Sequence, residues 1–158
     1  MAQEEIYNTR DRSYSAWHRR KSTARFVGIE RAQTLALIDL DASLWVECSD
    51  GDYEPLALIE TAVDRGQIFK SATLVRNLSR RTKPIVPAYC LLYTLSNDLN
   101  PGADFAVQDI TSFRVKRIFP VPESHWRTLS PQEWAEALVK IREWSAERLD
   151  GMLFGDAA

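Results

Sequence analysis

Ala36-Leu-Ile-Asp-Leu-Asp-Ala-Ser-Leu-Trp-Val-Glu-Cys48 and Pro55-Leu-Ala-Leu-Ile-Glu-Thr-Ala62 are the two stretches that decide the fold prediction. Both are rich in apolar, β-type residues and are predicted to be strands, and the cluster Ser49-Asp-Gly-Asp52 between them is typical of a hairpin turn. Each strand carries carboxylates inside apolar sequence, where an unpaired charge costs several kcal/mol. These acids therefore need a partner, and a divalent metal ion is the first candidate.

Length and composition favour a single globular domain over residues 1–158. With 158 residues, of which 45% are hydrophobic and 27% charged, the chain can bury one sizeable core but hardly two. The formal net charge of -2 conceals a basic N-terminal section, which runs from Arg10 to Arg25. Such a section could face phosphate although the whole chain is slightly acidic.

The two cysteines, Cys48 and Cys90, fall inside predicted strands and lack zinc-finger spacing, so we expect buried, reduced thiols. The two histidines, His18 and His125, have no acid or cysteine at ligand spacing, which argues against a zinc site or a histidine triad. No stretch has the pattern of a signal peptide or the roughly 20 apolar residues that span a bilayer. We expect a cytoplasmic protein without a membrane partner.

The pattern of apolar residues predicts three helices. A basic helix over residues 10–21 carries Tyr14 and Trp17 on one side, and its arginines are either solvated or held against phosphate. A second helix is predicted from Gln67 to Leu78. A third starts at a capping box with proline in the first helical position, Ser130-Pro-Gln-Glu133. The buried stripe of this last helix is predicted to contain Trp134, Leu138, Ile141 and Trp144.

Further strands are predicted from β-type composition. The segment Pro84–Tyr93 is almost continuously apolar, which favours a strand covered on both faces and parallel to Pro55–Glu60. Residues 112–119 alternate apolar and basic side chains, as an edge strand with one wet, positive face does. The remaining predicted strands are 26–29, 34–38 and 105–107, and the predicted loops are 96–102 and 120–129. The wet face is predicted to carry Arg114, Lys116 and Arg117.

This order of elements, with acidic residues inside the predicted strands, resembles that of the PD-(D/E)xK nuclease superfamily, also called the restriction-endonuclease-like fold. The resemblance is to small, often phage-borne members, in which case the location would be the host cell cytoplasm. It implies an α/β fold with a mixed central sheet flanked by helices, a core over about 14–119, and an accessory loop and C-terminal helix over 120–150. The runs that carry it are Tyr14-Ser-Ala-Trp17-His-Arg19, Asp39-Leu-Asp41, Trp45-Val-Glu47, Ala57-Leu-Ile-Glu60-Thr61 and Pro87-Ala-Tyr-Cys-Leu-Leu-Tyr93.

The resemblance also implies a site for hydrolysis of phosphodiester bonds. Asp41 matches the metal-binding aspartate of the family, Glu60 matches the glutamate of its Glu-x-Lys element, and the lysine of that element falls on Ala62. Two carboxylates would hold Mg²⁺ or Mn²⁺, and the lysine would stabilise developing negative charge. Because alanine cannot do this, we expect either a dead site or a relocated lysine, for which Lys70 is the candidate. Asp39 and Glu47 are candidate additional acids.

Three functions remain open from the sequence. The first is a Mg²⁺-dependent endonuclease or related DNA-processing hydrolase. The second is an inactive relative whose acids are held by neighbouring donors, and which binds DNA or a protein. The third is a phage structural or anti-defence protein that uses the scaffold for contacts with a protein partner or with copies of itself. The candidate nucleic-acid-binding residues are Arg19, Arg20, Lys21, Arg76, Arg80 and Arg81.

Overall fold

The computed structural model of the chain describes residues 13–18, 20–35, 40, 42–103 and 105–155. Two compact units divide the chain, Met1–Asp39 and Leu40–Ala158. The boundary separates the N-terminal helices of the predicted core from its sheet. Each unit has its own internal packing, and the single domain predicted over residues 1–158 stays a prediction.

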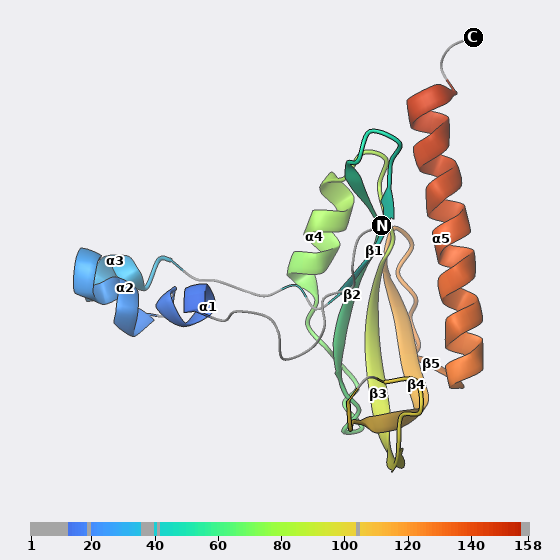
Figure 1. Cartoon of the computed structure of the whole chain (residues 1–158), viewed down its shortest axis with the longest axis horizontal. Coiled ribbons are helices and arrows are strands. Elements are labelled where there is room, and N and C mark those ends of the chain that lie inside the picture. Colours follow the sequence, from blue (N-terminus) through green and yellow to red (C-terminus); the bar gives the residue numbers. More distant parts are fainter. Residues whose placement is uncertain (1–12, 19, 36–39, 41, 104, 156–158) are drawn as a thin grey trace. The chain divides into compact units, whose positions relative to one another are not determined.

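The first unit contains three short helices. They are α1 (Ser13–Trp17), α2 (Arg20–Val27) and α3 (Ile29–Ala32), as Figure 1 shows in blue. The predicted basic helix over 10–21 is thus divided between α1 and α2, with the rings of Tyr14 and Trp17 5.9 Å apart as expected for neighbours on one side.

The predicted strand over residues 26–29 is wrong, because the backbone there is helical. The amide of Gly28 donates to the carbonyl of Ala24 at 3.0 Å, so the last turn of α2 includes Phe26 and Val27. Only Phe26, Val27 and Ile29 are β-type, and Gly28, with a φ of 84°, separates α2 from α3. Of the predicted strand over 34–38, residues 34 and 35 form no strand, and residues 36–38 lie outside the described residues.

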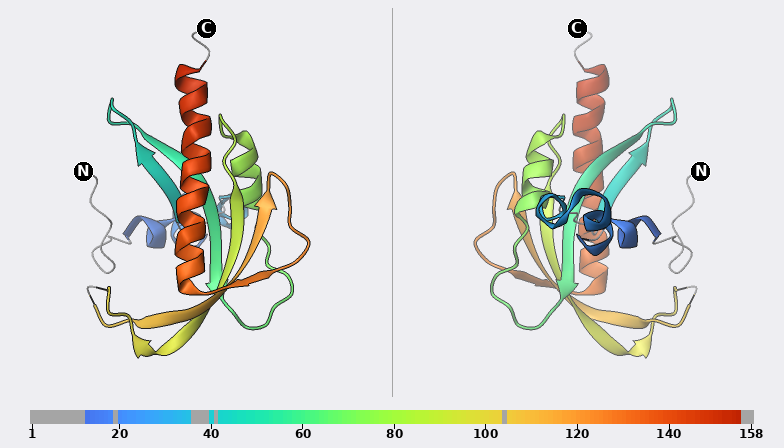
Figure 2. Two further views of the ribbon diagram at one scale, coloured as in Figure 1. Left: turned by 90° about the vertical axis from the view of Figure 1, so that its right-hand side faces the viewer. Right: turned by 90° about the vertical axis from the view of Figure 1, so that its left-hand side faces the viewer.

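The second unit is built on a five-stranded mixed sheet of order β1-β2-β3-β4-β5. Strands β2 and β3 are parallel and the other neighbours are antiparallel. Helix α4 (Thr73–Arg81) covers one face and helix α5 (Pro131–Phe154) covers the other (Figures 1 and 2). The predicted α/β class with a helix-flanked mixed sheet and a C-terminal helix is confirmed. The strands are β1 (Ala42–Glu47), β2 (Tyr53–Val63), β3 (Ala88–Leu99), β4 (Gln108–Phe119) and β5 (Arg127–Leu129).

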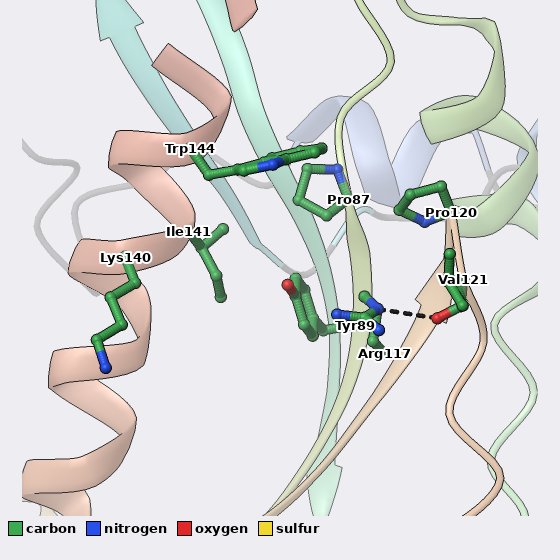
Figure 3. Close-up of a pocket in the computed structure, with 8 residues that line it drawn as sticks. All are labelled: Pro87, Tyr89, Arg117, Pro120, Val121, Lys140, Ile141 and Trp144. Atoms are coloured by element: carbon green, nitrogen blue, oxygen red, sulfur yellow. Dashed lines mark hydrogen bonds between the residues drawn. The ribbon is translucent and has the colours of Figure 1, made fainter. Parts of the chain in front are cut away.

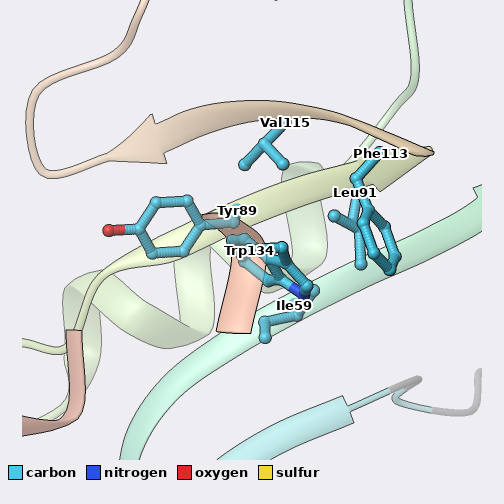
Figure 4. Close-up of a cluster of buried hydrophobic side chains, with 6 residues drawn as sticks. All are labelled: Ile59, Tyr89, Leu91, Phe113, Val115 and Trp134. Carbon is cyan, nitrogen blue, oxygen red and sulfur yellow. The ribbon is translucent and has the colours of Figure 1, made fainter. Parts of the chain in front are cut away.

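Apolar side chains fill the space on both faces of the central strands. On the face toward α5, hereafter the α5 face, six buried side chains form one cluster that includes Ile59 and Trp134 (Figure 4). On the opposite face, the α4 face, a second cluster includes Leu58 and Val75. Burial on both faces explains why the sequences of β2 and β3 are almost continuously apolar. It also fixes which side chains of each strand face α4, because residues alternate along a strand.

The predicted hairpin between β1 and β2 is confirmed. The amide of Cys48 donates to the carbonyl of Asp52 at 2.7 Å, and Gly51 takes a φ of 88°, which disfavours other residues. Leu44 pairs with Ala57 and Trp45 with Pro55, so Leu56 is skipped and a bulge interrupts the alternation of β2.

Several predicted boundaries near β4 are wrong. Residues 105–107 form no strand, and the loop predicted over 96–102 begins later because β3 continues to Leu99. Strand β4 is not an edge strand, because β5 pairs with it from within the predicted loop over 120–129. Arg114 and Lys116 share the α4 face, whereas Arg117 alternates to the α5 face with the buried Val115.

The start of α5 is confirmed as a capping box. The Ser130 hydroxyl accepts from the Glu133 amide at 3.1 Å, and the Glu133 carboxylate accepts from the Ser130 amide at 2.7 Å. Trp134 is buried as predicted, but Trp144 keeps 41% of its surface exposed, and the helix instead buries Ser145 and Leu149. Among the described helices, none is long and apolar enough to cross a membrane.

Candidate site at Glu60 and Lys70

Glu60 and Lys70 form an ion pair on the α4 face of the sheet. The Lys70 Nζ lies 3.2 Å from the Glu60 Oε1, and the two side chains keep 28% and 17% of their surface exposed. Glu60 belongs to β2, three residues before its end. Lys70 precedes α4, so its predicted place on a helix is wrong: the helix begins only at Thr73. Both side chains are partly exposed, so the pair is accessible to a ligand.

The segment that carries Lys70 is held in place by two side chains that are distant in the sequence, Arg114 and Trp126. We call residues 64–72 the anchored loop. The Arg114 guanidinium donates to both Asp64 oxygens at 2.7 and 2.6 Å and to the Gln67 carbonyl at 2.9 Å. The Trp126 indole donates to the Ile68 carbonyl at 2.8 Å. These bonds hold the backbone immediately before Lys70, and they bring its ammonium back to Glu60.

The tip of the anchored loop explains why the helical pattern from Gln67 misleads. Ile68, the first residue of the predicted apolar stripe, is 86% exposed, and its neighbour Phe69 is 79% exposed, whereas Val75 further along is buried. Asp64 also accepts from the amide of Gly66 at 2.9 Å, and Gly66 has a φ of 78°. The chain therefore turns at Gly66, and α4 begins only at Thr73.

Asp64 contributes a pH-dependent part of the stability. Its hydrogen bonds with Arg114 and Gly66 lower the pKa of the carboxyl from 3.8 to about 2. A carboxyl with a lowered folded-state pKa stabilises the fold above its unfolded pKa, and this stabilisation is lost as the pH falls through the folded value. The ion pair with Arg114 therefore contributes its full stabilisation of the fold at neutral pH, and this stabilisation is lost as the pH falls from about 4 to about 2.

We expect Asp64→Asn to lower the free energy of unfolding by about 1 to 2 kcal/mol at neutral pH, the range of a charged hydrogen bond that is partly exposed. Urea unfolding of both proteins at a series of pH values measures the difference, which should shrink toward zero near pH 2. Asp98→Asn, at an exposed position of β3, is the control and should change little. A deficit of Asp64→Asn that is the same at all pH values would contradict the ion-pair account.

Cys90 lies between Glu60 and a second lysine on the α4 face. In the register of the sheet, Glu60 is opposite Cys90, and Cys90 is opposite Lys116. Burial, followed by the charge of Glu60, raises the pKa of the Cys90 thiol to about 11, while Lys70 and Lys116 act against this rise. The thiol is therefore protonated at neutral pH and is a poor nucleophile.

Trp126 lies beside two cations of β4 on this face. The guanidinium carbon of Arg114 lies 5.3 Å from the indole centroid, and the Lys116 ammonium lies 5.8 Å from it. Both distances are in the range of cation–π attraction. The α4 face beside Glu60 thus holds Lys70, Lys116 and Arg114, of which Arg114 is neutralised by Asp64.

The other predicted acids are not brought to Glu60 in the described residues. Glu47 pairs with Tyr53 at the hairpin end of the sheet. Tyr53 is seven residues before Glu60 along β2, or about 23 Å at the rise of a strand, so Glu47 cannot share a metal ion with Glu60. The predicted Asp39 and Asp41 lie outside the described residues. Ala42, which follows Asp41 in the chain, is opposite Ile59, the neighbour of Glu60.

The described residues alone do not make a metal site. No group of three or more His, Cys, Asp or Glu side chains that could hold a metal occurs among them. Glu60 offers one carboxylate, and one of its oxygens already contacts Lys70. A divalent cation at Glu60 therefore needs at least one more acid, for which the sequence supplies Asp41.

The predicted nucleic-acid-binding residues fall on both units. Arg20 and Lys21 belong to α2 in the first unit, and Arg19 lies outside the described residues. Helix α4 buries Val75 and Ser79 against the sheet, and leaves its arginines exposed. Within the described part of the chain, none of the salt bridges uses an α4 arginine. These exposed arginines are Arg76, Arg80 and Arg81.

Sequence reasoning missed the residues that position Lys70. Asp64 and Trp126 carried no motif, and Arg114 was predicted only as one of several solvated cations. The alternation of basic residues in 112–119 was the one available signal, because it placed Arg114 and Lys116 on a common face. Their partners come from loops that local patterns do not link to β4.

Comparison of the chain with protein-family models, with curated proteins and with solved structures finds no match.

Proposed function

We propose that the chain is a DNA-processing protein of the PD-(D/E)xK type, which hydrolyses phosphodiester bonds with Lys70 in place of the lysine missing at Ala62. The observation that carries this proposal is the 3.2 Å contact between the Lys70 Nζ and the Glu60 Oε1. Ala62 and Glu60 lie on the same face of β2, two residues apart. Lys70 therefore brings an ammonium to the carboxylate from the anchored loop, whereas the family motif brings it from the strand.

Each member of the pair has a role in this chemistry. The Lys70 ammonium can donate to a non-bridging oxygen of the phosphodiester, and its charge stabilises the negative charge that grows there in the transition state. Glu60 holds the ammonium in place, and its second oxygen can accept a hydrogen bond from an attacking water. Lys116 adds positive charge on the same face, which favours a phosphate near the pair.

The proposal includes Mg²⁺ or Mn²⁺ as the cofactor of an active site, with Asp41 as the acid that joins Glu60. Such an ion would polarise the phosphodiester when bound. Because the described residues supply only Glu60, activity depends on Asp41 and should disappear when Asp41 is replaced. This dependence separates an active site from a scaffold that has lost its chemistry.

DNA is the proposed partner, and the cytoplasm, or the host cell cytoplasm for a phage-encoded chain, is the proposed location. The exposed arginines of α4 support DNA as the partner, since guanidinium groups bind phosphate oxygens well. Cys48 and Cys90 are both unpaired, which suits a reducing compartment.

Incubation of the full chain with supercoiled plasmid and with branched DNA tests this function. We expect nicked or linear products with Mg²⁺ or Mn²⁺ and none after chelation of the metal. The same assay with Asp41→Ala should give no products, while circular dichroism shows an unchanged fold. Intact DNA in every form, with either ion, would overturn the proposal.

An inactive DNA-binding module is the second candidate function. One oxygen of Glu60 is already neutralised by Lys70, as expected for an acid held by a neighbouring cation. The α4 arginines provide binding without any need for catalysis. This candidate predicts affinity for DNA without cleavage, and a protein partner or self-association remains its alternative use of the scaffold.

Replacing Arg80 and Arg81 together with glutamine should weaken DNA binding and make it less sensitive to salt. Each lost phosphate contact lowers the slope of log K against log salt by about 0.9, so we expect a change of about 2. Fluorescence anisotropy of a labelled duplex at several salt concentrations measures this slope. Arg142→Gln with Arg148→Gln, on α5, removes the same charge and is the matched control. An equal change in both double variants would exclude α4 as the binding surface.

A further inference from the structure

A pocket lies between α5 and the sheet, on the face opposite Glu60 and Lys70. Its volume is about 330 Å³. Trp144 and Ile141 point into it from α5 (Figure 3). Tyr89 of β3 and Pro87, which directly precedes β3, line the opposite side. The pocket belongs entirely to the second unit, and none of its lining residues takes part in the candidate site.

The pocket lies where β3 begins and β4 ends. Pro87 directly precedes β3 and Pro120 directly follows β4, and both line the cavity. Trp144, which also lines the cavity, stays 41% exposed. The result is an apolar wall with an uncovered indole, which suits a flat apolar ligand.

The charges of the pocket are all positive. Arg117 and Lys140 are its only ionisable lining residues besides Tyr89, and no described acid lines it. The Arg117 Nε donates to the Val121 carbonyl at 2.8 Å, which fixes the guanidinium beside the Tyr89 ring (Figure 3). A guanidinium has five donors, so this bond leaves donors for an anion.

The groups around Tyr89 do not cancel this charge. Burial raises the pKa of the Tyr89 hydroxyl, so it is a neutral donor at neutral pH. Of the charged groups that act on it, Arg117 and Arg127 are cations and Glu123 is an acid. Glu123 is bound by Arg127 through two contacts of 2.8 and 3.1 Å, which leaves Arg117 without a carboxylate partner among the described residues.

We propose that this pocket binds a small aromatic carboxylate. The planar guanidinium of Arg117 matches a carboxylate in shape and charge, and the Tyr89 hydroxyl is an additional donor. Trp144, Ile141 and the two prolines cover the ring. Lys140 lies on α5 with its side chain extending away from the cavity centre (Figure 3), so its charge acts at a distance. The proposal does not depend on the proposed function, because the site lies on the other face of the sheet.

Calorimetric titration with 2-naphthoate and with its neutral isostere 2-naphthamide tests the proposal. We expect the carboxylate to bind at least about 10-fold more tightly than the amide, since charge-assisted hydrogen bonds add about this much. Arg117→Gln should remove most of the preference. Lys116→Gln is the matched control, because it removes a positive charge from the neighbouring residue of β4 on the opposite face, and it should leave binding unchanged.

A second variant guards against loss of fold in Arg117→Gln. Trp144→Ala removes the apolar wall and should weaken both probes without altering the preference for the carboxylate. Circular dichroism checks the fold of each variant. Equal binding of carboxylate and amide, no binding of either at millimolar concentration, or equal losses in the Arg117 and Lys116 variants would each overturn the proposal.

Discussion

Replacing Glu60 with glutamine is expected to lower the rate of DNA cleavage by about 10²- to 10³-fold, the loss typical when one group of a preorganised electrostatic site is removed. Glutamine keeps the size of the side chain and its capacity for hydrogen bonds, so the α4 face should stay folded. It removes the negative charge that holds the Lys70 ammonium at 3.2 Å and that a metal ion would need. Rates of plasmid nicking for both proteins measure the effect.

The control for this variant is Glu54→Gln. Glu54 lies on the same strand as Glu60, six residues earlier, or about 20 Å away at the rise of a strand. Its replacement makes the same change in charge far from Lys70, and it should leave cleavage unchanged. If Glu60→Gln cleaved DNA as fast as the parent protein, Glu60 would have no catalytic role.

The second large effect is expected for Trp134→Ala, which should lower the free energy of unfolding by about 3 to 5 kcal/mol. Trp134 is only 6% exposed in the first turns of α5. Its ring centroid lies 6.4 Å from that of Tyr89 and 6.1 Å from that of Phe113, so it joins the helix to β3 and β4 (Figure 4). Alanine would leave a cavity at the centre of this cluster. Urea unfolding monitored by circular dichroism measures the loss.

Trp144→Ala is the matched control, since it removes the same side chain from the same helix. Trp144 is 41% exposed and packs on Arg148 at 4.7 Å, so we expect a loss of only about 1 kcal/mol. Equal losses for the two variants would mean that α5 is not held to the sheet mainly through Trp134.

The sheet was the part of the fold most open to prediction. The apolar runs of β2 and β3, the turn around Gly51 and the capping box at Ser130 each carry a strong local signal, and the structure confirms all of them. Local signals failed where a segment was short or its partners distant. Phe26 and Val27 are β-type residues but end α2, Ile29 begins α3, and β4 starts at Gln108, inside a predicted break.

The position of Lys70 could not be derived from local pattern. The contacts that hold the anchored loop join Asp64 to a residue 50 positions away and Ile68 to one 58 positions away. Helical periodicity placed Lys70 on α4, whereas the tertiary contacts of Arg114 and Trp126 keep it in the loop. The expectation that Lys70 approaches Glu60 came from the family resemblance, which places the segment after the Glu60 strand close to the metal site.

The two hypotheses for the site, an active nuclease and an inactive scaffold, assign different roles to the ion pair between Glu60 and Lys70. In the active site that we propose, Lys70 stabilises charge on a phosphate, and Glu60 orients it. In an inactive scaffold, the same contact merely neutralises a partly buried acid. Stability measurements alone do not separate these roles, since both predict a loss when either partner is removed. The two roles are separated by testing whether cleavage activity is restored when the lysine is moved to another position beside Glu60.

The most direct measurement is therefore the cleavage rate of the double variant Lys70→Ala with Ala62→Lys, compared with Lys70→Ala alone. Ala62 is two residues from Glu60 on the same face of β2, where the family motif has its lysine. We expect Lys70→Ala to lose about 10²-fold or more in rate, and the double variant to recover a large part of it. Full activity in Lys70→Ala, or no recovery in a folded double variant, would contradict the claim that Lys70 replaces the missing lysine.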